Sequence, residues 1–253
     1  MGKIIALVNQ KGGVGKTTTS VNLAAYLALF GKRVLLVDID PQGNASSGLG
    51  IVLREFDEHI YHALVIPEKF PKIIRNTNMD SLHVAPANSS LAGAAVELVN
   101  FPQREYRLRQ LLVEAKDKYD YIIIDSPPSL GLLTINGLVA ADQVLIPVQA
   151  EYYALEGLGQ LLKTINLVQA HLHPELQILG AVITMYDRRN RLSAAVMNEL
   201  YQYFPKRIFK SVIPRSVRLA EAPSHGMPIL LYDKNSTGSR AYQDLAQEIL
   251  NIT

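Results

Sequence analysis

Short apolar runs alternate along the chain with longer segments in which apolar residues recur at helical spacing. Several of the short runs, such as 4–8 and 121–124, are apolar at successive positions rather than at every second one. Such runs are typical of strands that helices cover on both faces. The pattern predicts strands at 4–8, 34–37, 82–85, 121–124, 143–148, 178–184 and 211–212.

The longer periodic segments predict the helices. They are expected at 16–29, 91–99, 103–116, 155–170, 191–203 and 239–249, whereas 50–79 has only weak periodicity. Strands that alternate with helices indicate an α/β fold, a mostly parallel twisted sheet with helices on both faces. Because no repeat, low-complexity tract or Pro/Gly-rich linker interrupts the pattern, we expect a single domain over residues 1–253.

Composition narrows the chemistry. The 253 residues suffice for a sizeable core and include no cysteine, which excludes disulfides, thiolate metal sites, iron–sulfur clusters and thiol nucleophiles. No apolar stretch reaches the roughly 18 residues of a membrane span, and the apolar start is too short for a signal peptide. We therefore expect a cytoplasmic protein.

A glycine-rich loop follows the first predicted strand and opens the first predicted helix. It reads Lys11-Gly12-Gly13-Val14-Gly15-Lys16-Thr17-Thr18. Backbone N–H groups of such a loop, together with the helix N-terminus, bind phosphate. Lys16 would neutralise the β- and γ-phosphates, and the Thr17 hydroxyl would ligate Mg²⁺. The ordinary P-loop has glycine where Gln10 stands, so this is the deviant Walker A form, with Lys11 as an additional lysine.

Two further predicted strands end in aspartate. Asp38 and Asp40 follow the strand at 34–37 at a spacing of two, which places both on one side of the strand, beside the loop. Asp125 ends the strand at 121–124, where it would hold Mg²⁺ through water next to Thr17. For Asp38 the sequence leaves two interpretations open, an outer ligand of the metal or a cap of the strand end.

Four segments together give the chain a family resemblance. It resembles the ParA/Soj family of deviant Walker A ATPases, within the ParA/MinD group, and in length it is similar to the short Soj-like type. The segments that carry the resemblance are Asn9 to Thr17, Val37-Asp38-Ile39-Asp40-Pro41-Gln42-Gly43-Asn44-Ala45, Asp125-Ser126-Pro127-Pro128-Ser129-Leu130-Gly131 and Val212 to Pro223.

The resemblance implies a P-loop NTPase fold and a role for each motif. ATP with Mg²⁺ would drive two subunits into a sandwich dimer, in which Lys11 reaches the partner's nucleotide. Asp40 would position or activate the attacking water, because phosphoryl transfer depends on positioning and charge neutralisation. The resemblance also implies that the loop at Met185 and the region of Pro214 flank the adenine.

One stretch of the chain is strongly basic, although the total charge is only +2. Residues 187–218 contain eight Lys or Arg and two acids, a net +6, which leaves −4 for the rest. The resemblance implies non-specific binding of double-stranded DNA through Arg189, Arg218 and Arg215. From the residues alone, a solvated basic face remains the alternative.

We therefore expect a Mg²⁺-dependent ATP hydrolase that segregates chromosomes or plasmids. The resemblance implies a ParB-like centromere-binding protein that stimulates hydrolysis, an ATP-bound homodimer, and a nucleoid-associated location without stable membrane binding. The alternative is a MinD-like membrane-surface ATPase for placement of the division site. That alternative requires a basic amphipathic C-terminus, whereas the polar side of residues 242–250 is acidic.

Overall fold

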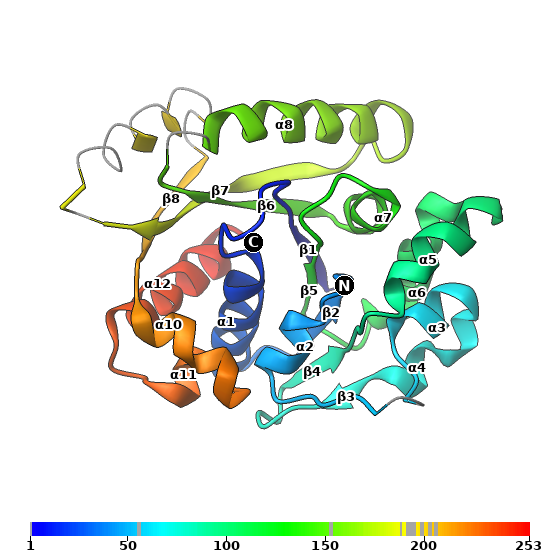
Figure 1. Cartoon of the computed structure of the whole chain (residues 1–253), viewed down its shortest axis with the longest axis horizontal. Helices are drawn as coiled ribbons and strands as arrows, with labels where there is room; N and C mark the ends of the chain where they lie inside the picture. Colours follow the sequence, from blue (N-terminus) through cyan, green and yellow to red (C-terminus); the bar gives the residue numbers. More distant parts are fainter. Residues whose placement is uncertain are drawn as a thin grey trace.

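A twisted sheet forms the centre of the molecule (Figure 1). The computed structural model describes residues 2–54, 57–151, 154–187, 189–190, 196–197, 200–201, 204 and 207–253. Within these ranges the strands are β1 (Lys3–Leu7), β2 (Val34–Asp38), β3 (Arg75–Asn76), β4 (Leu82–Ala85), β5 (Tyr121–Asp125), β6 (Gln143–Gln149), β7 (Gln177–Tyr186) and β8 (Ile208–Pro214). Their order is β3-β4-β2-β5-β1-β6-β7-β8, and all neighbours are parallel except β3 and β4.

Helices cover both faces of this sheet (Figure 1). The α-helices are α1 (Lys16–Leu29), α2 (Asn44–Gly48), α3 (Ile60–Val65), α4 (Phe70–Ile73), α5 (Leu91–Glu97), α6 (Arg107–Ala115), α7 (Leu132–Ala140), α8 (Ala154–His171), α10 (Val217–Glu221), α11 (Ile229–Tyr232) and α12 (Thr237–Ile252). Short 3-10 turns are η1 (Pro67–Lys69), η2 (Leu98–Asn100), η3 (Arg104–Tyr106) and η4 (Ala222–His225). None of the helices in the described ranges is both long and apolar enough to cross a bilayer.

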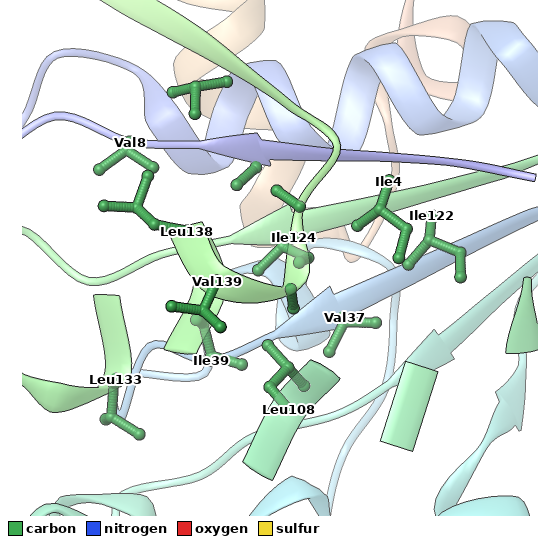
Figure 2. Close-up of a cluster of buried hydrophobic side chains, with 14 of the residues drawn as sticks. Ile4, Val8, Val37, Ile39, Leu108, Ile122, Ile124, Leu133, Leu138 and Val139 are labelled. Carbon is green, nitrogen blue, oxygen red and sulfur yellow. The ribbon is translucent and has the colours of Figure 1, made fainter. Parts of the chain in front are cut away.

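The alternation of side chains along β1 divides the core into two layers. Ile4, Ala6 and Val8 belong to one buried cluster, and Ile5 and Leu7 belong to the other. The first layer includes residues of α6, α7 and α8, and the second those of α1 and α12. Figure 2 shows part of the first layer, where side chains from three strands meet those of α6 and α7. Both faces of the strand are therefore buried, which explains its continuous apolar sequence.

The predicted α/β fold is confirmed, with differences at the ends of elements. The predictions at 82–85 and 16–29 coincide with β4 and α1, whereas the strand predicted at 211–212 extends over Ile208–Pro214. The predicted helix at 191–203 lies largely outside the described residues. Elements without a prediction include α2, α3, α4, α7, α10, α11 and β3.

Parallel pairing aligns the carboxyl ends of the three central strands. Leu7 and Asp38 are both register partners of Asp125 on β5, which lies between β1 and β2. The loops that follow these strands therefore leave the sheet at one edge. In open α/β sheets such an edge is where ligands bind.

Candidate nucleotide-binding and catalytic site

The loop of residues 8–15 joins β1 to α1. Gly13 and Gly15 have φ of 75° and 82°, a left-handed conformation that side chains rarely adopt. Gly15 directly precedes the 14-residue helix α1, so the loop turns straight into a helix N-terminus. Thr17 and Thr18 stand in the first turn of that helix. Free N–H groups and the helix dipole make such an N-terminus a site for anions.

Hydrogen bonds to distant parts of the chain hold the loop in place. The Asn9 side chain accepts a hydrogen bond from the Lys11 N–H at 3.0 Å and donates one to the Pro147 carbonyl at 2.7 Å. The Thr184 hydroxyl donates to the Val14 carbonyl at 2.8 Å. The phosphate loop is thereby fixed to the ends of both β6 and β7.

Lys16 is the first residue of α1, directly after the loop, and it is only 6% exposed. Its ammonium donates to the Lys11 carbonyl at 3.1 Å. Burial lowers the pKa of Lys16, while the nearby carboxylates of Asp125 and Asp40 oppose this shift. The predicted lysine and both predicted carboxylates therefore come together at one point.

Asp125 and Thr17 are in direct contact, as expected for two groups around one cation. The Thr17 hydroxyl donates to Asp125 Oδ2 at 2.8 Å, and the Ser20 hydroxyl donates to Oδ1 at 2.7 Å. Burial, and then the negative charge of Asp38, raise the pKa of Asp125 to about 7. An accumulation of buried carboxylates with this consequence favours a bound cation.

Hard oxygen donors such as these fit Mg²⁺. In the described part of the chain, no group of three or more His, Cys, Asp or Glu residues could hold a metal ion. Mg²⁺ commonly takes its further oxygens from phosphate and water in nucleotide-binding proteins. Thr17 and Asp125 are the side chains that fit this role.

Asp38 is fully buried beneath the loop that carries Asp40. Its Oδ1 accepts the Asp40 N–H at 3.1 Å, and its Oδ2 accepts the Ser46 N–H at 2.9 Å and the Ser46 hydroxyl at 2.7 Å. Burial raises the pKa of Asp38 to about 6, with a smaller contribution from the charge of Asp40. These bonds favour the cap over the outer metal ligand, the two interpretations that the sequence leaves open. Asp40 Oδ1 in turn accepts the Gln42 N–H at 2.9 Å.

Lys11, the additional lysine, forms an ion pair with Glu151, which lies two residues after the end of β6. Its ammonium lies 3.1 Å from Glu151 Oε2. The other oxygen of Glu151 accepts a hydrogen bond from the Gln149 amide at 2.6 Å and lies 3.8 Å from the guanidinium of Arg215. Glu151 therefore links the phosphate loop to the end of β8.

Met185 and Pro214 lie at the carboxyl ends of the adjacent strands β7 and β8. Tyr186 and Pro214 are register partners. The end of the Met185 side chain is near Gly15, and Met185 has a positive φ of 52°. The two predicted adenine-flanking residues therefore lie at the same end of two paired strands, with Met185 next to the phosphate loop.

The three arginines predicted to bind DNA are all on the surface. Their side chains are 91% exposed for Arg189, 64% for Arg215 and 57% for Arg218. Arg189 and Arg215 line one hollow, of about 960 Å³, between β8 and α12, whereas Arg218 lies on α10. Arg188, Arg191 and Lys206 of the basic stretch lie outside the described residues.

Each of these arginines has an acidic neighbour, which the charge count along the sequence does not anticipate. Their nearest N–O distances are 3.1 Å for Arg189–Asp187, 3.8 Å for Arg215–Glu151, 3.1 Å for Arg218–Glu221 and 3.5 Å for Arg218–Asp233. Three of the four acids come from outside residues 187–218. In this conformation the basic stretch is therefore partly neutralised by other segments.

Several residues that organise the site were not predicted. Ser20 stands three positions after Thr17 on α1, and this spacing could have revealed it. The others contact residues far away in the sequence, so no local pattern marks them; they are Asn9, Ser46, Glu151 and Thr184.

The sheet order, the phosphate loop and the Thr17–Asp125 contact define a P-loop nucleoside-triphosphatase. Comparisons with known proteins agree. The family model described as an AAA domain matches residues 2–178. Sporulation initiation inhibitor protein Soj of Bacillus subtilis is 59% identical over 249 residues, which are 98% of either chain. Chromosome-partitioning ATPase Soj of Treponema pallidum is 51% identical over 99% of this chain and 98% of its own.

A solved structure extends the agreement to the whole fold. Cobyrinic acid a,c-diamide synthase of Mycobacterium smegmatis, crystallised with ADP and magnesium, superposes with a TM-score of 0.87 at 36% identity. The match covers 99% of this chain and 95% of that one. The chain belongs to the ParA/Soj family of chromosome-partitioning ATPases, and its enzyme class is ATP hydrolase.

Proposed function

We propose that this chain, acting as a single domain over residues 1–253, is an ATP-driven switch for chromosome or plasmid segregation. ATP and Mg²⁺ join two subunits into a sandwich dimer, the dimer binds DNA without sequence preference, and hydrolysis releases it. A ParB-like partner stimulates that hydrolysis. The observation that carries the proposal is the meeting of Lys16, Asp125 and Asp40 beside one phosphate loop.

Each residue of the site has a distinct role in this proposal. Lys16 and the backbone of residues 11–18 bind the phosphates, and Thr17 and Asp125 hold Mg²⁺, which would neutralise charge on the β- and γ-phosphates. Asp40 orients the attacking water. The support for its role is its closeness to Lys16 and the hydrogen bonds that fix its backbone and carboxylate.

Lys11 acts on the partner's nucleotide. Its present contact is a partly exposed ion pair with Glu151, and such pairs contribute only about 0–1 kcal/mol. A phosphate of the nucleotide bound to the second subunit can therefore replace Glu151 at little cost. This exchange would make the active dimer depend on ATP in both subunits.

DNA binds through Arg189, Arg215 and Arg218 in this proposal. Their exposed ion pairs are weak in the same sense, so DNA phosphates can displace the acids. The two subunits of the dimer double the number of arginines, and affinity rises steeply with the number of phosphates neutralised. Binding that relies on phosphates has no sequence preference and a strong dependence on salt.

The MinD-like alternative finds no support in the closing helix. Tyr242, Leu245 and Ile249 of α12 are buried in the core layer that contains α1. An apolar face that packs inside the protein is not available to a membrane surface. We therefore prefer the function as a DNA-binding segregation ATPase over that as a membrane-surface ATPase.

The proposed switch is tested by Asp40→Ala. Without the group that orients water, hydrolysis should fall by at least about 100-fold, while the phosphate loop remains intact. With ATP, the variant should accumulate as a dimer on size exclusion and stay bound to plasmid DNA. Asp117→Ala, which removes an exposed carboxylate far from the loop, is the control and should behave as wild type. An Asp40→Ala protein that remains a monomer with ATP and ignores DNA would refute the proposal.

A further inference from the structure

The loop that carries Asp40 is anchored to the segment after β4. Two side chains connect them, Asp38 at the end of β2 and Ser46 within α2. Asp38 accepts the Asp40 N–H with one oxygen and the two Ser46 donors with the other. Ser46 Oγ then accepts the Ala87 N–H at 3.0 Å. The chain of hydrogen bonds runs from residue 87 to the backbone of Asp40.

Ser46 is the central member of this chain. Its residue is 2% exposed, and its hydroxyl uses its proton on Asp38 and a lone pair on the Ala87 N–H. A buried hydroxyl with a charged acceptor on one side and a backbone donor on the other has one preferred orientation. Ser46 therefore fixes where the Asp38 carboxylate lies, and Asp38 fixes the Asp40 N–H.

A close backbone contact leaves the loop little freedom beside this chain. Gly43 has a φ of 62°, and a Cβ added there would lie 2.6 Å from the Ala87 carbonyl oxygen. The Gly43 N–H also donates to the Asp40 carbonyl at 2.9 Å. The turn 40–43 is thus held from both sides, by its own hydrogen bonds and by the backbone at residue 87.

We propose that Ser46 is a positioning residue for ATP hydrolysis, which holds the Asp40 carboxylate in place through Asp38 and ties it to the segment after β4. The proposal rests on the role of Asp40 as the group that orients water. Within the described part of the chain, the Ser46 N–H and hydroxyl form their hydrogen bonds with Asp38 and Ala87, which both lie outside the phosphate loop. Its influence therefore falls on the chemical step and leaves nucleotide binding nearly unchanged.

Ser46→Ala tests this role, with Ser47→Ala as a matched control. The neighbouring Ser47 belongs to the same helix, but it is exposed and its hydroxyl donates only to the Asn44 carbonyl at 3.2 Å. In Ser46→Ala, kcat should fall roughly 10- to 100-fold, the range expected for a small displacement of a reacting group. KM for ATP and the affinity for ADP should change less than about twofold. Ser47→Ala should match wild type in all three quantities.

Ser46→Cys keeps the shape of the side chain and weakens its hydrogen bonds, because a thiol is a poor donor and acceptor. Its kcat should lie between those of wild type and Ser46→Ala, at an unchanged KM. This variant also decides the question if Ser46→Ala does not fold. A Ser46→Cys protein with wild-type kcat would then overturn the inference.

A double substitution separates this inference from the proposed role of Asp40. Once Asp40→Ala has abolished the orienting carboxylate, adding Ser46→Ala should lower the residual hydrolysis no further. Additive losses would show that Ser46 acts elsewhere, which overturns the inference but not the role of Asp40. Normal hydrolysis by Asp40→Ala would instead refute the role of Asp40 itself. Equal kcat in Ser46→Ala and Ser47→Ala, with Asp40→Ala inactive, would refute the inference alone.

Discussion

Three buried carboxylates and one buried lysine determine the chemistry of the site. Asp38, Asp40 and Asp125 are each at most 6% exposed, and Lys16 is the cation that lies among them. The excess of negative charge is unfavourable in the protein alone, and a bound Mg²⁺ would compensate it. Burial, and to a smaller extent the charge of neighbouring carboxylates, raise the pKa values of Asp38 and Asp125.

The raised pKa of Asp38 predicts how the stability of the nucleotide-free protein depends on pH. The pKa of Asp38 is raised from 3.8 to about 6. Between these two pH values the folded state retains a proton that the unfolded chain has lost. Its contribution to stability is complete below about pH 4 and is lost as pH rises through about 6. Asn cannot ionise. The unfolding free energy of Asp38→Asn minus that of wild type should therefore be larger at pH 8 than at pH 5.

Chemical denaturation at the two pH values measures this difference. Asp117→Asn is the control, because Asp117 is exposed and its substitution should give the same difference from wild type at both pH values. A difference for Asp38→Asn that does not change with pH would contradict the account of the buried carboxylates.

Site residues that belong to a recognisable sequence motif could be predicted. Lys16 and Thr17 follow from the loop, and Asp125 follows from its position at the end of an apolar strand. Ser46 could not be found in this way, because its hydroxyl acts on Asp38 and Ala87, and the latter is 41 residues distant. Hydrogen bonds of this kind become visible only when the sheet has brought β2 and β4 together.

Among the elements, α2 and η4 meet through two glycines with positive φ. Gly50 has a φ of 78° and Gly226 a φ of 63°. A Cβ added to Gly226 would lie 2.8 Å from the Gly50 Cα, which is backbone and cannot move aside cheaply. This contact joins the helix that carries Ser46 to the segment that follows Arg218.

Gly226→Ala should therefore destabilise the protein for two reasons, conformation and space. Gly31→Ala is the matched control, because Gly31 has a φ of 81° but, among the residues that the structure describes, none beyond its chain neighbours comes within 4 Å of the added Cβ. We expect Gly31→Ala to lower the free energy of unfolding by about 1–2 kcal/mol, and Gly226→Ala to lower it by roughly 1–3 kcal/mol more. Equal losses in thermal or chemical unfolding would contradict the packing of η4 against α2.

Some helices and strands were not predicted, because the hydrophobic and polar residues in them do not alternate periodically. Helix α7 is apolar on nearly all sides, because it is buried between the sheet and its neighbouring helices. It also contains Gly137. Without a polar face it has no amphipathic signal. Strand β3 has only two residues, and α3 and α4 are short, so no period could appear in 50–79.

At the scale of the whole molecule, charge is distributed differently from its distribution along the chain. Residues 187–218 are strongly basic in sequence, but Glu151, Glu221 and Asp233 fold against Arg215 and Arg218. A count along the chain cannot include acids that arrive from other segments. The surface proposed to bind DNA is therefore a set of exchangeable ion pairs, which is consistent with binding that occurs in one nucleotide state.

The most direct test is co-sedimentation with plasmid DNA, and in parallel with anionic lipid vesicles, in ATP, in ADP and without nucleotide. The wild type should sediment with DNA only in ATP and should not sediment with vesicles. Arg218→Glu and Arg189→Glu should each weaken the DNA interaction by roughly tenfold or more, with ATP hydrolysis by the free protein nearly unchanged. Arg33→Glu, an exposed arginine paired with Asp120, should bind as wild type does. Equal binding to DNA in ADP and ATP, or ATP-dependent sedimentation with vesicles instead, would refute the proposed ATP-dependent binding to DNA.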